Sequence, residues 1–342
     1  MSIQEIPPRQ VRAPELYGDY WFGSEPVVVS ALGGHMLLLE FWDYTCAYCE
    51  RSLPYVKEWH RKYSEYGLVV VGAHTPKFPF GKNPEYLQKA IEHQGIEYPV
   101  VMDNEALIWT KYGNRVWPAI YLIDRDGYIR YNHFGEGEYL AIEHLIQTML
   151  YNAGVREEMP LLMEPAREDD RPGAISFRAT PELFAGYLRG SIGNVEGYVP
   201  EAVVTYGDPK IYFDGRFYAE GAWLNDRYFL QLHDEEQKGG QIMLHYNAVE
   251  ASAVIKPEGE KGFQVTVKQD AQYLTIENMG EDVHIDQDGR SYLIIDEPRM
   301  YHIVKNREYG EHILRLGAHS NGFALYSFAF LSGVIPELVP SR

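Results

Sequence analysis

Short apolar runs alternate with amphipathic segments in the first half of the chain. Residues 37 to 42 are apolar except for Glu40, and residues 68 to 73 form a second apolar run. Such runs predict strands that are covered on both faces, as in a parallel or mixed sheet. Apolar positions also recur at helical spacing in residues 53 to 63 and 84 to 94. The alternation predicts an α/β domain with a mixed central sheet flanked by helices.

From about residue 211 the pattern changes. Aromatic and β-branched runs of five to nine residues follow one another, and Asp-Gly, Gly-Gly and Asn-Gly pairs separate them. These pairs favour tight turns between antiparallel strands. The second half is therefore predicted to be an all-β sandwich.

A charged stretch that contains several prolines separates the two patterns, as is typical of a linker. We predict a first domain at residues 1–154, a linker at 155–180 and a second domain at 181–342. Two domains also fit the length of 342 residues, which exceeds the size at which a single core usually keeps growing. Thr180 followed by Pro181 predicts the start of a helix at the head of the second domain.

The charge balance narrows the classes of function. The chain has 31 basic and 49 acidic residues, a formal net charge of −18, which argues against a nucleic-acid partner and an anionic membrane surface. The first residues show no basic segment followed by an apolar one, and no apolar run approaches the roughly 20 residues of a membrane span. On the sequence as it stands we expect a cytoplasmic protein, or an extracytoplasmic one if the N-terminus has been trimmed.

The chain has two cysteines, Cys46 and Cys49, and they follow directly on the first apolar run. A helix that begins there would place Cys46 at its N-terminus, where free N–H groups and the helix dipole favour a thiolate. We predict that Cys46 is the nucleophile and that Cys49, one turn deeper, resolves the mixed disulfide. A zinc site needs about four ligands, and a disulfide across so short a loop would add little stability. The cysteine pair is thus expected to be the redox group itself, with no metal and no other cofactor.

The apolar run with its two cysteines and the later Trp117-Pro118 resemble the thioredoxin superfamily. Phe41-Trp42 ahead of the cysteines is similar to the TlpA-like branch. Further motifs resemble the soluble C-terminal part of DipZ-type proteins, in which a thioredoxin domain precedes a β-sandwich like a carbohydrate-binding module. These motifs are Leu53-Pro54-Tyr55-Val56, His74-Thr75-Pro76, Tyr121-Leu122-Ile123-Asp124 and His133-Phe134-Gly135-Glu136-Gly137.

The resemblance implies a jelly-roll sandwich for the second domain and several roles in the first. The Trp117-Pro118 bond is expected to be cis and to lie against the cysteines, so that Pro118 belongs to the catalytic site. The backbone of Trp117 would then pair with an extended substrate. Trp42, Thr45 and Tyr48 are expected to contact the substrate as well. Thr45 stands where thioredoxin itself carries an aromatic residue.

Glu40 lies in the middle of the predicted strand, where thioredoxins carry a buried acid. A carboxylate that is buried without a partner is costly when charged, so its pKa should rise toward neutrality. Glu40 could then accept the proton of Cys49 as that thiol attacks. The alternative is a glutamate at an exposed edge, or one that is paired with Lys or Arg.

Together these features predict a thiol-disulfide oxidoreductase that exchanges disulfides with a protein partner and is served by an upstream thiol donor. A thiol peroxidase on the same fold is the first alternative, although Asp43 stands where peroxidatic sites carry threonine. The second alternative is a binding protein whose thiols are incidental. Its second domain would take a glycan on aromatic side chains, which equally suit core packing: Trp223, Tyr228, His245, Tyr246, Tyr301 and Tyr326.

Overall fold

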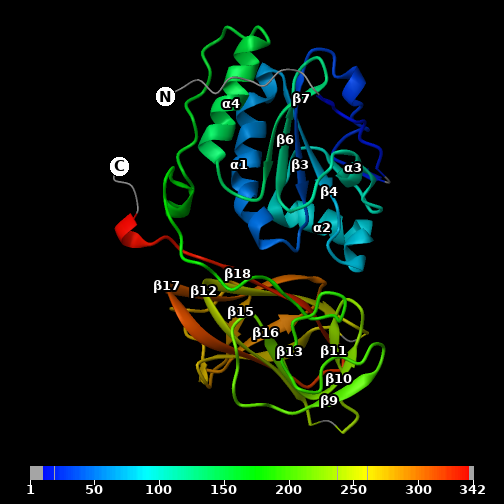
Figure 1. The fold of residues 1–342 in the computed structure, drawn as a ribbon, viewed down its shortest axis with the longest axis vertical. Helices are drawn as coiled ribbons and strands as arrows, with labels where there is room; N and C mark the ends of the chain where they lie inside the picture. The colour runs from blue at the N-terminus through cyan, green and yellow to red at the C-terminus, as the bar shows by residue number, and fades with distance from the viewer. Residues whose placement is uncertain (1–10, 19, 237, 260, 339–342) are drawn as a thin grey trace. The chain divides into compact units, whose positions relative to one another are not determined.

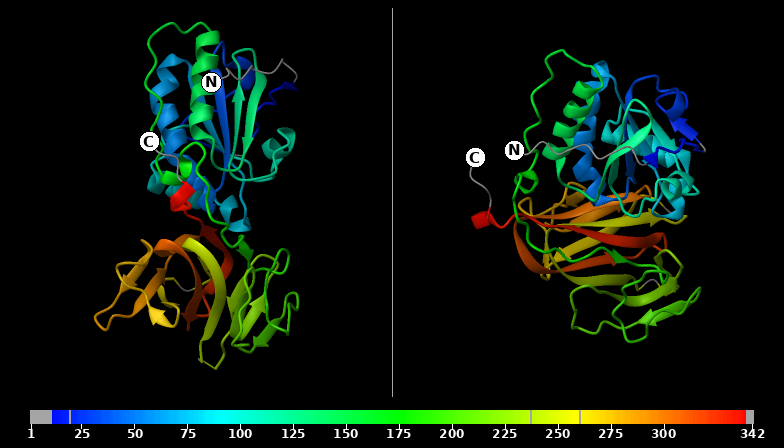
Figure 2. Two further views of the ribbon diagram at one scale, coloured as in Figure 1. Left: turned by 60° about the vertical axis from the view of Figure 1, so that its left-hand side comes forward. Right: turned by 45° about the horizontal axis from the view of Figure 1, so that its top comes forward.

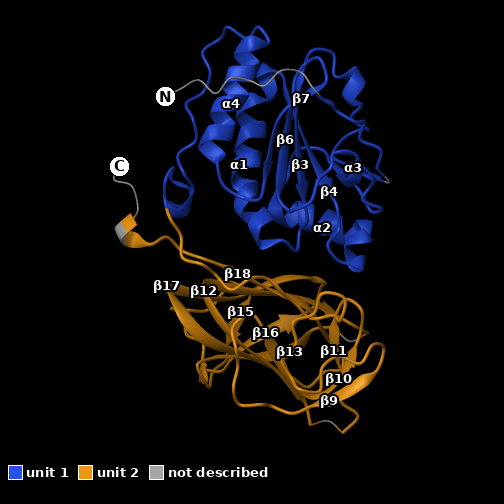
Figure 3. Cartoon of the chain, in the orientation of Figure 1, with its two compact units in different colours: residues 1–174, 340–342 blue, residues 175–339 orange. Residues whose placement is uncertain are grey.

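The computed structural model describes residues 11–18, 20–236, 238–259 and 261–338. The chain forms two compact units, and the boundary between them lies between residues 174 and 175 of the sequence (Figure 3). No helix in the described ranges is both long and apolar enough to cross a membrane.

The first unit is built on a seven-stranded mixed sheet with the strand order β1-β7-β6-β3-β4-β5-β2 (Figure 1). Strand β3 lies at its centre, parallel to β4 and antiparallel to β6, and all seven of its residues are buried. The strands are β1 (Val11–Arg12), β2 (Tyr20–Phe22), β3 (Met36–Trp42), β4 (Leu68–His74), β5 (Val100–Met102), β6 (Ala119–Ile123) and β7 (Tyr128–Phe134).

Helices α1 and α4 cover one face of this sheet and α3 covers the other (Figure 2). Helix α2 has clear end signals, because the Asn83 side chain accepts the N–H of Glu85 and Gly95 ends the helix at φ 59°. The predicted α/β domain with a mixed sheet is confirmed. Its helices are α1 (Ala47–Tyr63), α2 (Pro84–Gln94), α3 (Leu107–Lys111) and α4 (Tyr139–Asn152), with 3₁₀ turns η1 (Val29–Ala31), η2 (Ser64–Tyr66), η3 (Pro79–Lys82) and η4 (Glu168–Asp170).

The second unit is all-β, as predicted, and contains an eleven-stranded sheet. Its long strands β12 and β17 pair along most of their length, and β12 also pairs with β10 at one end and with β18 at the other. The jelly-roll type stays a prediction. The elements are β8 (Leu183–Phe184), β9 (Val203–Tyr206), β10 (Phe217–Asn225), β11 (Leu230–Leu232), β12 (Gly240–Pro257), β13 (Phe263–Gln269), β14 (Gln272–Tyr273), β15 (Val283–Ile285), β16 (Ser291–Ile295), β17 (Arg299–Ala318), β18 (Phe323–Leu331) and the 3₁₀ turn η5 (Pro336–Leu338).

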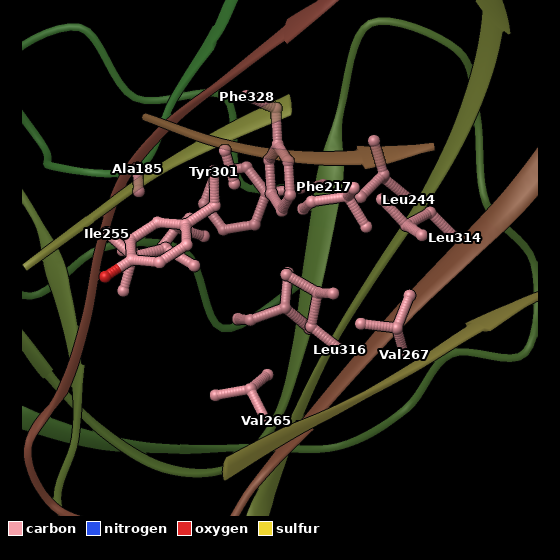
Figure 4. Close-up of a cluster of buried hydrophobic side chains, with 14 of the residues drawn as sticks. Ala185, Phe217, Leu244, Ile255, Val265, Val267, Tyr301, Leu314, Leu316 and Phe328 are labelled. Atoms are coloured by element: carbon pink, nitrogen blue, oxygen red, sulfur yellow. The ribbon is translucent and has the colours of Figure 1, made fainter. Parts of the chain in front are cut away.

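The aromatic side chains of the second unit largely fill its core. Trp223, Tyr246 and Tyr301 are fully buried, and 4% of Tyr326 is exposed. Figure 4 shows Tyr301 among aliphatic side chains and Phe328. Four of the six candidate glycan-contacting residues therefore serve packing, and only Tyr228 and His245 are partly exposed.

The segment predicted as a linker, 155–180, divides between the two units. Residues up to 174 belong to the first unit, where Asp169 pairs with Arg51 at 2.8 Å and Asp170 accepts the hydroxyl of Tyr55 at 2.7 Å. These contacts hold Asp169 and Asp170 against α1.

The helix predicted to begin at Thr180 does not form, and this prediction was wrong. The Thr180 hydroxyl donates to Asp214 and accepts the backbone N–H of Asn247, and the chain continues into strand β8. A residue that is favourable at a helix N-terminus is used here for tertiary hydrogen bonds, which local sequence patterns do not reveal.

Candidate active site

Cys46 caps the N-terminus of α1. Its backbone is extended (φ −105°), and its sulfur lies 3.2 Å from the backbone nitrogen of Cys49, whose N–H it accepts. The Cys46 carbonyl also accepts the N–H groups of Cys49 and Glu50. Both cysteines are free thiols. The Cys46 sulfur thus sits where the end of the helix stabilises a negative charge.

Cys49 lies inside the first turn of α1 and is chemically different from Cys46. Burial, the neighbouring Cys46 sulfur and the charge of Glu40 raise the pKa of the Cys49 thiol well above its usual range. Cys49 therefore keeps its proton in the reduced protein, and a nearby base must take this proton before Cys49 can attack.

Glu40 is 1% exposed and lies on the face of β3 that α1 covers. It accepts hydrogen bonds from the Ser52 hydroxyl at 2.7 Å and from the Tyr98 hydroxyl at 3.2 Å. No Lys or Arg among the described residues pairs with it, so the predicted alternative of a salt-bridged glutamate does not apply. Burial raises the pKa of Glu40 to about 7, although the two hydroxyl groups act to lower it.

Ser52 was missed by sequence analysis. Its hydroxyl lies 2.7 Å from Glu40 Oε1 and 2.9 Å from the carbonyl oxygen of Cys49, so it connects the acid with the turn that carries Cys49. The available signal was its position three residues after Cys49, which places it on the same face of the helix.

Asp43 and His74 form a second buried network beside the cysteines. Asp43 Oδ1 accepts the N–H and the hydroxyl of Thr45, and Oδ2 accepts the N–H of Lys77 at 2.9 Å. His74 Nε2 lies 3.4 Å from the same Oδ2. The backbone carbonyl of Asp43 accepts the N–H of Cys46 at 3.1 Å. The carboxylate therefore fixes the loop that leads into the nucleophile.

The charges around Asp43 outweigh its burial. Burial acts to raise the pKa of this carboxyl, but the contact with His74, the hydroxyl of Thr45 and the charge of Lys77 together lower it to about 2. The His74 ring is fully buried and stacks on Tyr44 with 5.4 Å between the ring centroids. Asp43 is thus permanently charged at neutral pH and acts as an anchor of the loop.

The Trp117-Pro118 bond is cis, as the resemblance implies. Pro118 is buried and Trp117 is half-buried. The Trp117 indole donates a hydrogen bond to the carbonyl of Thr75 at 3.0 Å, and its ring packs on Trp109 at 4.4 Å. The proline loop is thereby tied to the loop that follows β4 and begins at Thr75.

The structure separates the four residues that were predicted to contact the substrate. Trp117 and Tyr48 are half-buried, which leaves part of each side chain accessible. Trp42 and Thr45 are only 2% and 1% exposed, which argues against the predicted direct contact. Trp42 packs edge-on against His74, and Thr45 is bound to Asp43, so both support the loop from within.

Comparison with known families agrees with this arrangement. Residues 12–132 match the AhpC/TSA family, and residues 180–330 match the family described as the thioredoxin-like C-terminal domain. The first unit, with its central mixed sheet and the cysteine pair at the head of α1, is thioredoxin-like, and the second unit matches the thioredoxin-like C-terminal domain family.

The chain is also similar to individual proteins. The chain is 32% identical over 270 residues to protein DipZ of Mycobacterium bovis, a match that covers 77% of this chain and 37% of that protein. It is 26% identical over 138 residues to the thiol-disulfide oxidoreductase YkuV of Bacillus subtilis, which covers 40% of this chain and 93% of YkuV. The crystal structure of a thiol-disulfide isomerase from Corynebacterium glutamicum is 28% identical, with a TM-score of 0.37, and covers 40% of this chain and 96% of the isomerase.

Proposed function

We propose that this protein is a thiol-disulfide oxidoreductase that exchanges disulfides with protein partners. One observation carries the proposal: two free thiols share the first turn of α1, and their surroundings differ. The Cys46 sulfur accepts a backbone N–H at the end of the helix, whereas Cys49 is held protonated beside Glu40. The similarity to YkuV, which is named for this activity, supports the same chemistry.

In the reductive direction, the Cys46 thiolate attacks one sulfur of a partner disulfide. The partner's S–S bond breaks, a mixed disulfide forms on Cys46, and the departing partner sulfur leaves as a thiolate that takes a proton. Cys49 then loses its proton and attacks the Cys46 sulfur. This step forms the Cys46–Cys49 disulfide and releases the second partner thiol. An upstream dithiol reduces the pair again, and the reverse sequence oxidises a partner dithiol.

Glu40 is the group that we propose to accept the Cys49 proton. Its pKa of about 7 means that a substantial fraction of this carboxyl is deprotonated at neutral pH and can bind a proton. Its charge already acts on Cys49, since it contributes to the raised pKa of that thiol. Ser52 holds the acid and the Cys49 turn together.

The proposal is tested by protein-disulfide turnover with a dithiol donor. Cys46→Ser should abolish turnover, because the remaining thiol, Cys49, has a raised pKa and stays protonated. In the reduced protein at neutral pH, iodoacetamide should label Cys46 selectively. Turnover that survives in Cys46→Ser, or equal labelling of the two thiols, would contradict the assignment.

The match to the AhpC/TSA family keeps peroxidase activity as the alternative to be measured alongside. Peroxidatic sites use a hydroxyl group at the position of Asp43. Here a carboxylate stands there, and Thr45, Lys77 and His74 already engage it. We therefore expect hydrogen peroxide to be consumed much more slowly than a protein disulfide is reduced by the same donor. The opposite ranking would favour the peroxidase.

A further inference from the structure

The second unit carries a hollow of about 700 Å³ that the thiol chemistry does not use. This volume falls within the range of about 300–1,000 Å³ that is typical of small-molecule sites. Its walls come from β10, β12, β13, β14, β17 and the turn before β12. Because all of its lining residues belong to this unit, the hollow is a feature of the β-domain itself.

The floor of the hollow is a polar stretch of sheet. Gln241 of β12 pairs with Gly317 of β17, which in turn pairs with Thr266 of β13, so the three lie side by side. Their neighbours Ile242 and Leu316 are fully buried in the core. Since successive residues of a strand point to opposite faces, Gln241 and Thr266 point away from the core and into the hollow.

Gly317 keeps the middle of this floor open. A Cβ atom built on Gly317 would meet nothing closer than the Thr266 Cβ at 3.8 Å, which is an ordinary contact. Its φ lies outside the left-handed region, so other residues fit its backbone. Position 317 can therefore be enlarged to fill the hollow without strain.

The hollow is cationic on a strongly acidic protein. Its lining includes Lys238, Lys268 and Arg315 against the single carboxylate of Glu220, whereas the whole chain carries a net charge of −18. Such a local excess attracts anions. Lys238 is 77% exposed and already pairs with Glu236.

The two other cationic side chains of the lining are Arg315 and Lys268. Arg315 donates to the Tyr212 hydroxyl at 2.9 Å and lies 3.7 Å from Asp208, which compensates part of its charge. Lys268 pairs across the sheet with Arg315, and its Nζ lies 4.5 Å from the ring centroid of Tyr273. Within the described residues Lys268 makes no ion pair, so its charge is free for a ligand.

We propose that this hollow binds a small hydroxylated ligand with one anionic group, namely a sugar acid or a sugar phosphate. Lys268 takes the anionic group, with Arg315 beside it. Gln241 and Thr266 offer hydrogen bonds to hydroxyl groups, and the Tyr273 ring forms an apolar wall. A neutral sugar would leave the Lys268 charge unused, and a purely apolar ligand would leave the floor unpaired.

Calorimetric titration of the full chain with three probes tests the proposal. Glucuronate carries a carboxylate, glucose 6-phosphate carries a phosphate, and glucose is the neutral match. We expect at least one of the charged probes to bind about tenfold or more tightly than glucose, and to weaken as salt is added. The charged probe that binds more tightly shows whether the site prefers a carboxylate or a phosphate group. Failure of both to bind, or glucose binding as tightly, would overturn the proposal.

Variants locate the site. Lys268→Gln should weaken binding of the charged probe about tenfold or more. Lys305 lies on β17 but outside the hollow, so Lys305→Gln is the matched control and should leave binding unchanged. Gly317→Phe should abolish binding by filling the hollow, while Gly317→Ala should keep it. Unchanged binding in Lys268→Gln would refute the site. Should Gly317→Phe fail to fold, the two lysine variants still decide the question.

The thiol chemistry provides a separate readout. Each variant should keep the protein-disulfide turnover of the unaltered chain, since none of these residues lies in the first unit. Normal turnover with lost ligand binding would support this site alone. Lost turnover in Cys46→Ser with normal ligand binding would support the redox site alone.

Discussion

Glu40 and Asp43 are two carboxylates that lie three residues apart and are equally buried. Their surroundings nevertheless shift their pKa values in opposite directions. Each is 1% exposed. Around Glu40 the partners are two neutral hydroxyl groups, and burial raises its pKa to about 7. Around Asp43 the partners are backbone N–H groups, a hydroxyl and His74, and its pKa falls to about 2.

The difference shows that burial alone does not decide the charge of an acid. The type of partner decides it, because several N–H donors and the charge of Lys77 compensate the carboxylate of Asp43, while two hydroxyl groups do not compensate that of Glu40. The region of Glu40 can therefore exchange a proton at neutral pH, and the region of Asp43 cannot. One acid suits a chemical role and the other a structural role.

The largest effect is expected from breaking the Asp43 region. Asp43→Asn leaves the buried His74 without its charged partner and places an amide against the N–H of Lys77. Hydrogen bonds to a charged acceptor contribute about 1.5–3 kcal/mol each, and Asp43 accepts three of them from Thr45 and Lys77, so chemical denaturation should show a loss of several kcal/mol. The exposed Asp126→Asn serves as the control. A loss below about 1 kcal/mol would mean that Asp43 is not an anchor.

The second effect is a pH dependence that belongs to Glu40. Its folded pKa of about 7 exceeds its ordinary value of 4.5, so the folded state binds more protons between these values and its stability falls as pH rises through this window. The difference corresponds to about 3 kcal/mol, which Glu40→Gln should remove. The exposed Glu105→Gln is the control. The same Glu40→Gln chain should accumulate mixed disulfide at neutral pH, because Cys49 has lost its proton acceptor.

The outcome that would contradict this assignment is specific. If Glu40→Gln keeps the slope of stability between about pH 4.5 and 7, the titrating group is not Glu40. If it removes the slope but resolves the mixed disulfide at the normal rate, Glu40 titrates but does not accept the proton of Cys49.

The smallest effect should follow from Ser52→Ala. Its hydroxyl acts to lower the pKa of Glu40, so its removal should shift that pKa further upward and cost about 1 kcal/mol. The midpoint of the pH dependence of stability measures the shift, and the exposed Ser24→Ala is the control. A midpoint that does not move would mean that Ser52 does not act on Glu40.

The sequence could predict those parts of the site whose residues lie close together along the chain, but not those that depend on pairing between distant segments. The cysteine pair, its helix and the buried Glu40 follow from a single apolar run and its continuation. The pairing of Asp43 with His74 does not, because it requires the register of two strands in which Trp42 lies opposite His74. Ser52 was within reach, since its spacing from Cys49 is local.

The second unit shows the same limit more strongly. Its all-β character is visible in the repeated short runs and turn pairs, but strand alternation does not tell a core tyrosine from a ligand contact. Tyr301 looked like a candidate for glycan contact and is fully buried. The hollow around Gly317 is formed by three strands whose paired residues, Gln241, Thr266 and Gly317, lie about 25 to 75 positions apart in the sequence. Local sequence patterns do not predict such distant pairings.

The central claim is that Cys46 attacks and Cys49 resolves, and trapping the mixed disulfide tests it most directly. Cys49→Ser and Cys46→Ser are each incubated with the same disulfide-bonded protein, quenched with acid and weighed by mass spectrometry without reductant. The account predicts a stable covalent adduct on Cys49→Ser and none on Cys46→Ser. Adducts of equal yield on both variants, or an adduct on Cys46→Ser alone, would contradict it.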